Sequence, residues 1–147
     1  MEFAATSKKT GSVTFTACKH IQLRIENARI PWEPSVYGGD GSELRKNISF
    51  CANDEIMQSV AAMEEILDSP VSSCIKEDTI KCKISLDKTR YYDQAKNRIE
   101  EVKSFRGWTV NAMITVRGKW ETRSQSGLCL EVTDLQLLTP SDPPCPF

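Results

Sequence analysis

The chain has few of the features that mark enzymes, metal proteins and membrane proteins. It contains one histidine, and its six cysteines form no Cys-x-x-Cys spacing, which argues against a zinc site and a histidine-based catalytic relay. Neither a Gly-x-x-x-x-Gly-Lys loop nor a Gly-x-Gly-x-x-Gly turn occurs, so the common phosphate- and dinucleotide-binding loops are excluded. No apolar run approaches the ~20 residues that a membrane-spanning helix needs. We therefore expect no metal, no cofactor, no membrane contact and no enzymatic activity.

Paired carboxylates offer no better catalytic candidates. Glu64 and Glu65 are adjacent, as are Glu100 and Glu101, and adjacent side chains on a helix diverge. We interpret both pairs as side chains on solvent-exposed faces.

The first twelve residues are small and polar, and they lack the apolar core of a secretory signal. A protein that stays inside the cell keeps its cysteines reduced, so we expect a cytoplasmic or nuclear protein with free thiols. Cys82 and Cys129 fall in strand-like runs, where they are expected as small core residues.

With 147 residues, 39% of them hydrophobic and 27% charged, the chain has the length and composition of one globular domain. Four prolines fall in the last nine residues. The predicted organisation is a flexible N-terminal tail over residues 1–12, an OB-like domain over residues 13–138 and a proline-rich tail over residues 139–147.

Alternating hydrophobicity predicts most of the domain to be β-structure. From Trp108 to Val116 every even position is apolar, and Leu128, Leu130 and Val132 repeat this period of two. Further strand-like runs are predicted over residues 13–25, 48–50 and 80–86.

One helix is clearly marked by its sequence. Asn53 or Asp54 caps its start, and apolar residues recur at helical spacing as far as Leu67. Residues 88–106 allow two interpretations, a second helix or a long basic loop. A shift of apolar phase at Asp134 predicts a β-bulge in the last strand.

The order of these elements is strands, helix, strand, basic connection and two strands. It matches the OB-fold, a small antiparallel barrel with the helix between its third and fourth strands. A generic α+β meander fits nearly as well. We predict a mainly β (β-rich α+β) domain that forms a small antiparallel OB-like barrel with one or two helices.

The charge is uneven along the chain, although the net charge is only −1. Residues 76–123 carry 12 basic and 7 acidic side chains, whereas residues 1–75 and 124–147 each have a net charge of −3. A local patch, and not the total, sets the field at a binding groove. The basic segment is therefore the expected place of contact with an anionic partner.

Cations stand next to aromatic residues at several positions. Proteins that bind single-stranded nucleic acid use cations to follow the phosphates and rings to stack the bases. The expected stacking residues are Trp32, Tyr37, Tyr91 and Trp120. The expected phosphate contacts are Arg29, Arg45, Lys46, Lys81, Lys83, Arg90, Arg98, Arg106, Arg117 and Lys119.

Each candidate has a structural alternative. Trp108 continues the apolar face of its run and is expected in the core, whereas Trp120 is equally compatible with core and surface. If residues 88–106 form a helix, Tyr92 begins its buried face, and Tyr91 then faces outward. Lys81 and Lys83, each considered alone, also fit a role as charges that protect a strand edge from aggregation.

Residues 29–37, Arg-Ile-Pro-Trp-Glu-Pro-Ser-Val-Tyr, resemble the segment after the first strand in single-stranded DNA-binding proteins of large DNA viruses and some phages. Those proteins have the OB-fold. The resemblance implies a viral DNA-replication protein in which Trp32 and Tyr37 face the DNA.

The last six residues, Asp-Pro-Pro-Cys-Pro-Phe, are similar to the tip of bacterial single-stranded DNA-binding proteins. That tip is an acidic stretch ending in Pro-Phe, by which replication partners are recruited. This chain departs from it in having one tail carboxylate and additional prolines. The resemblance implies a partner-binding role for Pro146 and Phe147, whose ring and carboxylate suit an apolar pocket with a basic rim.

The sequence thus predicts a protein that binds single-stranded DNA, or RNA, without catalysis. The alternative is a structural or protein-interaction domain of a larger assembly, in which exposed aromatic residues anchor an interface. A homo-oligomer is compatible with either function.

Overall fold

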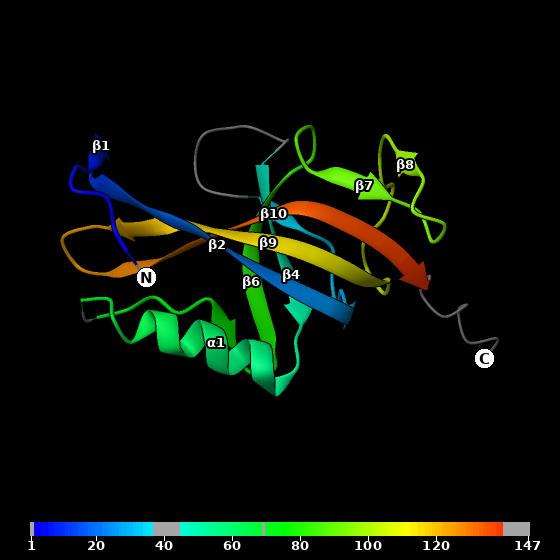
Figure 1. The fold of residues 1–147 in the computed structure, drawn as a ribbon, viewed down its shortest axis with the longest axis horizontal. Helices are drawn as coiled ribbons and strands as arrows, with labels where there is room; N and C mark the ends of the chain where they lie inside the picture. The colour runs from blue at the N-terminus through cyan, green and yellow to red at the C-terminus, as the bar shows by residue number, and fades with distance from the viewer. Residues whose placement is uncertain (1, 37–44, 69, 140–147) are drawn as a thin grey trace.

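The structure is a twisted β-sheet that closes on itself, with a helix along one side (Figure 1). The computed structural model describes residues 2–36, 45–68 and 70–139. The strands are β1 (Lys8–Thr10), β2 (Val13–Arg29), β3 (Ser35–Val36), β4 (Arg45–Cys51), β5 (Ile75–Lys76), β6 (Thr79–Ser85), β7 (Arg90–Tyr92), β8 (Arg98–Ile99), β9 (Thr109–Glu121) and β10 (Ser126–Thr139). The helix is α1 (Asp54–Glu64).

A ring of strands forms the centre of the fold. The strands pair in the order β6, β4, β2, β9 and β10, and β10 then pairs with β6 to close the ring. In Figure 1, β4 and β6 run across the direction of β2, β9 and β10. A mainly β, OB-like fold is consistent with this ring.

Two strand pairs differ from the antiparallel pairing that the sequence predicts. β10 runs parallel to both β6 and β7. Parallel neighbours need a long crossover connection, and the chain between β6 and β10 supplies one, since it contains β7, β8 and β9. The expectation of purely antiparallel pairing is therefore wrong at these two pairs.

The run predicted over residues 13–25 lies in one long strand, β2, which register shifts bend without ending its pairing with β9. α1 consequently lies between the second and third strands of the ring, whereas the OB-fold plan has its helix between the third and fourth strands. The predicted bulge is confirmed, because the pairing of β9 with β10 shifts between Val132 and Asp134.

The helix α1 begins where its capping residues predict. The side chain of Asn53 accepts a hydrogen bond from the N–H of Ile56 at 2.9 Å, and Asp54 and Glu55 place negative charge at the helix N-terminus. Val60 is fully buried. Among the described residues, no helix has the length and apolar character to cross a membrane.

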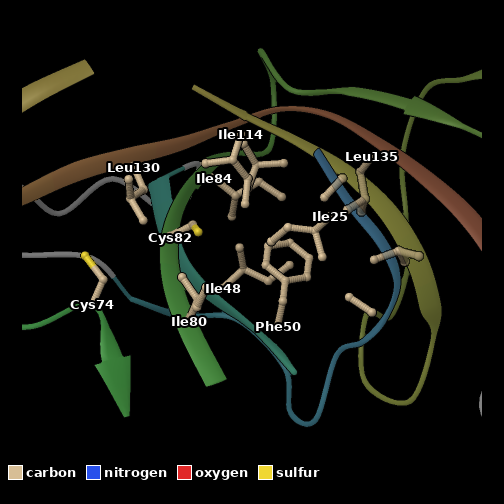
Figure 2. Close-up of a cluster of buried hydrophobic side chains, with 14 of the residues drawn as sticks. Ile25, Ile48, Phe50, Cys74, Ile80, Cys82, Ile84, Ile114, Leu130 and Leu135 are labelled. Carbon is tan, nitrogen blue, oxygen red and sulfur yellow. The ribbon is translucent and has the colours of Figure 1, made fainter. Parts of the chain in front are cut away.

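Apolar side chains from five strands fill the inside of the ring, as Figure 2 shows. Full burial of one such side chain contributes roughly 1.5–3 kcal/mol to folding. Since residues of a strand alternate between its two faces, the outer faces carry the polar and charged residues. Among the residues labelled in this view, the fully buried ones are Ile25, Ile48, Phe50, Ile80, Ile84, Ile114, Leu130 and Leu135.

Residues 88–106 contain the short strands β7 and β8, and no α-helix occurs in this segment, all of which the structure describes. The interpretation as a second helix is therefore wrong. Because β7 follows a strand period, Tyr91 points inward with 2% of its surface exposed, and its ring centroid lies 6.1 Å from that of Phe105. Tyr92, on the other face, is half-buried. The expected outward orientation of Tyr91 is thus also wrong.

Part of the predicted N-terminal tail joins the sheet. β1 pairs with β2, and Phe3 forms a β-bridge with Cys18. These contacts are made by the backbone, which the polar sequence of residues 1–12 does not reveal. The division of the chain into one domain and two tails otherwise stays a prediction.

Candidate nucleic-acid interface

A groove runs beside β6. Its larger part is a hollow of about 360 Å³ between β6, the segment after α1 and the β9–β10 hairpin. A second hollow of about 220 Å³ shares Lys83 with the first. We call the two hollows together the β6 groove. Its charged and aromatic lining consists of Arg45, Lys46, Lys81, Lys83, Lys88, Glu131 and Trp120.

The alternation of residues along β6 directs its lysines into this groove. The apolar residues of β6 are buried in the core, so Lys81 and Lys83 point outward. On β4, Asn47 is the neighbour of Lys83 and also lines the groove. The period of two that predicts the strand therefore also predicts which of its residues share the outer face.

Trp120 stands on the hairpin side of the groove and is half-buried. It pairs with Gly127 on β10 and with Phe15 on β2. Part of the indole is therefore covered by the sheet, and part is open to the groove. A ring held in this way presents a flat surface at a low cost in side-chain entropy.

The segment after α1 forms a wall of the groove, and Glu64 fixes its position. The carboxylate of Glu64 accepts hydrogen bonds from the hydroxyl of Ser73 at 2.6 Å and from the N–H of Cys74 at 2.8 Å. The N–H of Ser126 on β10 donates to the carbonyl of Pro70 at 3.0 Å. Glu64 is 8% exposed, so its interpretation as solvated is wrong: it satisfies a buried backbone N–H.

Three cysteines lie at or near the groove. Burial first, and then the nearby charge of Glu64, raise the pKa of the Cys74 thiol to about 12. Burial also raises the pKa of Cys82 and of Cys129. These thiols stay protonated at neutral pH and are weak nucleophiles. Cys82 lies in the core as predicted, whereas Cys129 alternates with the inward leucines of β10 and is only half-buried.

Two cations predicted at the hairpin have partners of their own. Arg117 Nε lies 3.3 Å from a carboxylate oxygen of Glu131, and Glu131 lines the groove. Lys119 Nζ lies 3.2 Å from Glu121 and 4.6 Å from the ring centre of Phe3. Arg117 therefore offsets a negative charge in the groove, whereas Lys119 contacts the N-terminal segment.

Another group of predicted contacts lies at the opposite end of β2 and β9. Arg29 pairs with Thr109, whereas Trp120 pairs with Phe15. The segment from Thr109 to Trp120 extends over roughly 35 Å at the rise of a β-strand. Trp32 follows Arg29 and is 49% exposed. Trp32 does not line the β6 groove.

Glu33 ties the loop that carries Trp32 to the segment before β9. Its carboxylate accepts hydrogen bonds from the hydroxyl of Ser104 and the N–H of Phe105, both at 2.7 Å, and from the N–H of Arg106 at 3.3 Å. Partial burial alone would raise the pKa of Glu33, but these hydrogen bonds and the charge of Arg106 outweigh it and lower the pKa. Arg106 is therefore near Trp32 and not in the β6 groove.

The remaining predicted residues lie elsewhere. Arg90 and Arg98 are on β7 and β8, where Arg90 Nε lies 2.8 Å from Asp134. Tyr91 is in the core, and burial, followed by the charge of Asp87, raises its pKa to about 12. Three predicted residues lie outside the described residues: Tyr37, Pro146 and Phe147.

The structure brings together five of the predicted nucleic-acid contacts, which are Arg45, Lys46, Lys81, Lys83 and Trp120. Sequence reasoning missed Lys88, which belongs to the basic segment but directly follows β6 in a turn. It also missed the polar groups of Asn47, Ser73 and Thr122, which line the groove without any charge signal.

No protein-family model and no curated protein sequence matches the chain. Solved structures similar to it in fold include two of one phage protein. The single-stranded DNA-binding protein of bacteriophage Enc34, truncated at its C-terminus, has a TM-score of 0.61 and 14% identity, with 92% of this chain and 94% of that chain covered. The structure of that phage protein in complex with single-stranded DNA has a TM-score of 0.58 and 14% identity, over 92% and 95% of the two chains. At this identity, the likeness shows a shared fold and supports the OB-like prediction.

Proposed function

We propose that the chain binds single-stranded DNA in the β6 groove and catalyses no reaction. The observation that carries this proposal is the convergence of Trp120 with five cations from β4, β6 and the turn after β6. Side chains separated by up to 75 positions in the sequence line one groove there. The cations attract phosphates, and the indole offers a stacking surface for a base.

The position of the groove in the ring supports the same function. In OB-folds, oligonucleotides bind on the face of the second and third strands and at the loops between strands 1 and 2 and between strands 4 and 5. Here β4 and β6 are the second and third strands of the ring, and the β9–β10 hairpin joins the fourth and fifth. The fold shared with the phage protein gives independent support, since that protein is described in complex with single-stranded DNA.

The contacts available in the groove favour binding without strong sequence preference. Lysine ammonium groups contact phosphates as point charges, and an indole stacks on any base. Glu131 lies in the groove beside these cations, but Arg117 offsets its charge. Stacking on Trp120 would contribute about 1–3 kcal/mol per base.

For the end of the chain, we propose that Pro146 and Phe147 recruit a protein partner, on the ground of the Pro-Phe tip described above. For the compartment, we propose the cytoplasm or nucleus of the host cell, where single strands arise during replication.

Fluorescence anisotropy with a labelled single-stranded oligonucleotide tests the proposal. The wild-type chain should bind with a Kd below ~10 µM at low salt, and its affinity should fall steeply as salt rises. Lys81→Glu should weaken binding at least tenfold, since it reverses an exposed charge in the groove. Lys103→Glu is the matched control, because Lys103 is also exposed but does not line the groove.

Two results would contradict the proposal. Absence of binding below ~10 µM at low salt would remove it, because even nonspecific binding reaches about 1–100 µM at physiological salt. Equal affinity for a duplex of the same sequence would remove the stacking role of Trp120, since paired bases do not offer their faces to a side chain.

A further inference from the structure

Another hollow, separate from the two that form the β6 groove, lies on the outer face of β2, β9, β10 and β7. It has a volume of about 310 Å³. Among the described residues, none lines both this hollow and the β6 groove. We propose that it is a second binding site for a single-stranded segment of nucleic acid, and we call it the far-face site. The proposal rests on the proposed function, because it assumes that single strands are the partner of this chain.

Strand register places the residues of the far-face site in rows across the sheet. Met113 on β9 lies between Arg24 on β2 and Asp134 on β10, and Asp134 in turn neighbours Arg90 on β7. Their inward neighbours, such as Ile25 with 2% exposure, belong to the core. The row therefore faces solvent.

The next row adds an aromatic ring and another cation. Asn111 on β9 neighbours Gln136 on β10, which neighbours Tyr92 on β7, and Tyr92 neighbours Arg98 on β8. Because residues opposite each other in a ladder share a face, Arg98 stands beside the Tyr92 ring on the outer side. The half-buried phenol and the thioether of Met113 provide an apolar surface that suits a flat ring.

Hydrogen bonds hold the floor of the site in place. The side chain of Asn111 donates to Gln136 at 3.1 Å and accepts from the N–H of Asn27 at 3.0 Å. The hydroxyl of Tyr92 donates to Asp134 at 3.3 Å. These contacts fix the Tyr92 ring before any ligand arrives, which lowers the entropy that binding would cost.

The lining residues carry a net positive charge, because Arg24 and Lys96 outnumber Asp134. Asp134, the acidic residue in the lining, is paired with Arg90 at 2.8 Å. Arg24 pairs with Glu26 at 3.0 Å, but both side chains are more than half exposed, so this pair is weak. Lys96 lines the site from the turn after β7. A ligand with a flat ring and a phosphate matches this combination, and a nucleotide unit of a single strand has both.

The turn that carries Lys96 is fixed by Asp93, whose carboxylate accepts the N–H groups of Ala95 and Asn97 at 2.9 and 2.8 Å. Lys96 has a φ of +66°, a conformation that glycine adopts more easily than lysine. Lys96→Gly therefore removes the cation without a cost to the fold, and it is a clean probe of the far-face site.

The test is the number of short oligonucleotides that one chain binds, measured by native mass spectrometry and titration calorimetry. The probe is an oligonucleotide of about four nucleotides, the lower end of the site size of an OB-fold. We expect two binding events per chain. The double variant Arg24→Gln, Lys96→Gly should lose one of them, and Trp120→Ala with Lys81→Glu should lose the other. The control Lys103→Gln should keep both.

Other outcomes overturn the proposal in distinguishable ways. One event per chain, lost with the groove variants and unchanged in the far-face variant, removes the far-face site and leaves the proposed function intact. No event at any concentration removes the proposed function itself. If a Glu- and Phe-rich peptide binds the wild-type chain but not the far-face variant, while no oligonucleotide binds there, the face serves a protein partner and the proposal is wrong.

Discussion

Gly127 lies directly against the ring of Trp120, its partner across the β9–β10 hairpin. A Cβ atom on Gly127 would come within 2.6 Å of ring carbons of Trp120 and within 2.7 Å of its ring nitrogen. Real Cβ atoms do not approach other atoms so closely, so any side chain at position 127 must displace the ring. The glycine therefore determines where the indole stands in the β6 groove.

Gly127→Ala should accordingly weaken single-strand binding by displacing Trp120. Since a stacked base is worth about 1–3 kcal/mol, Trp120→Ala should cost about 5- to 150-fold in affinity. We expect Gly127→Ala to lose a large part of that amount, measured by anisotropy with a labelled oligonucleotide. Gln125→Ala is the control, because Gln125 is exposed just before β10 and does not line the groove.

The two substitutions should not be additive. Once Trp120 is alanine, the ring that Gly127 positions is gone, so Gly127→Ala should cost no further affinity in that background. Full additivity would show that Gly127 acts on binding by another route, and the positioning role would be wrong.

Lys88 should contact the phosphates although it lies outside the strands. For single strands the logarithm of the affinity falls with the logarithm of salt concentration, by about 0.7 per phosphate contact. Lys88→Gln should therefore reduce this slope by about 0.7, in titrations from low to physiological salt. Lys103→Gln should leave the slope unchanged. An unchanged slope in Lys88→Gln would exclude Lys88 from the interface.

The parts of the site that the sequence predicts are those governed by local alternation. The apolar positions of β6 identify its inward face, and Lys81 and Lys83 follow as outward residues from the period of two alone. The start of α1 is equally local, because Asn53 caps the helix through a residue only three positions away.

The parts that the sequence does not predict depend on pairing between distant segments. Trp32 and Trp120 both have cations nearby in the sequence, but the register of β2 with β9 places Arg29 and Trp120 at opposite ends of the ladder. Tyr91 and Tyr92 exchange their expected faces because β7 pairs with β10 instead of forming a helix. Residue types alone contain no information about register.

The charged carboxylate of Glu33 should stabilise the folded protein at pH values above the ordinary carboxyl pKa. This stabilisation should be lost in acid. Its pKa is lowered from 4.5, so the folded state holds the charged form more strongly than the unfolded state does. Glu33→Gln should therefore lower Tm at pH 7, and the difference from wild type should shrink as the pH falls below about 4.5. Differential scanning calorimetry across this range measures it.

Glu26→Gln is the matched control for Glu33, since Glu26 is exposed and its pair with Arg24 should add little stability. The Glu33 variant also separates the two groups of predicted contacts. Because neither Trp32 nor Glu33 lines the β6 groove, Glu33→Gln should change oligonucleotide affinity less than twofold. A larger loss would mean that the loop carrying Trp32 takes part in the binding of the strand.

Among the glycines that the structure describes, Gly118 should be the one whose replacement damages the fold most. A Cβ at this position would lie 2.1 Å from the carbonyl oxygen of Thr16 and 2.9 Å from the Cα of Ala17. Both are backbone atoms of β2, so relief requires the two strands to separate close to where Trp120 pairs with Phe15. Gly118→Ala should cost about 3 kcal/mol or more in urea unfolding, at the upper end of overpacking effects. Gly11→Ala should cost only about 1 kcal/mol, because its φ of +61° is strained for alanine but no atom lies within 4 Å. Equal stability of the two variants would show that β2 and β9 can move apart at Gly118 without cost. The close approach of their backbones would then not fix the hairpin.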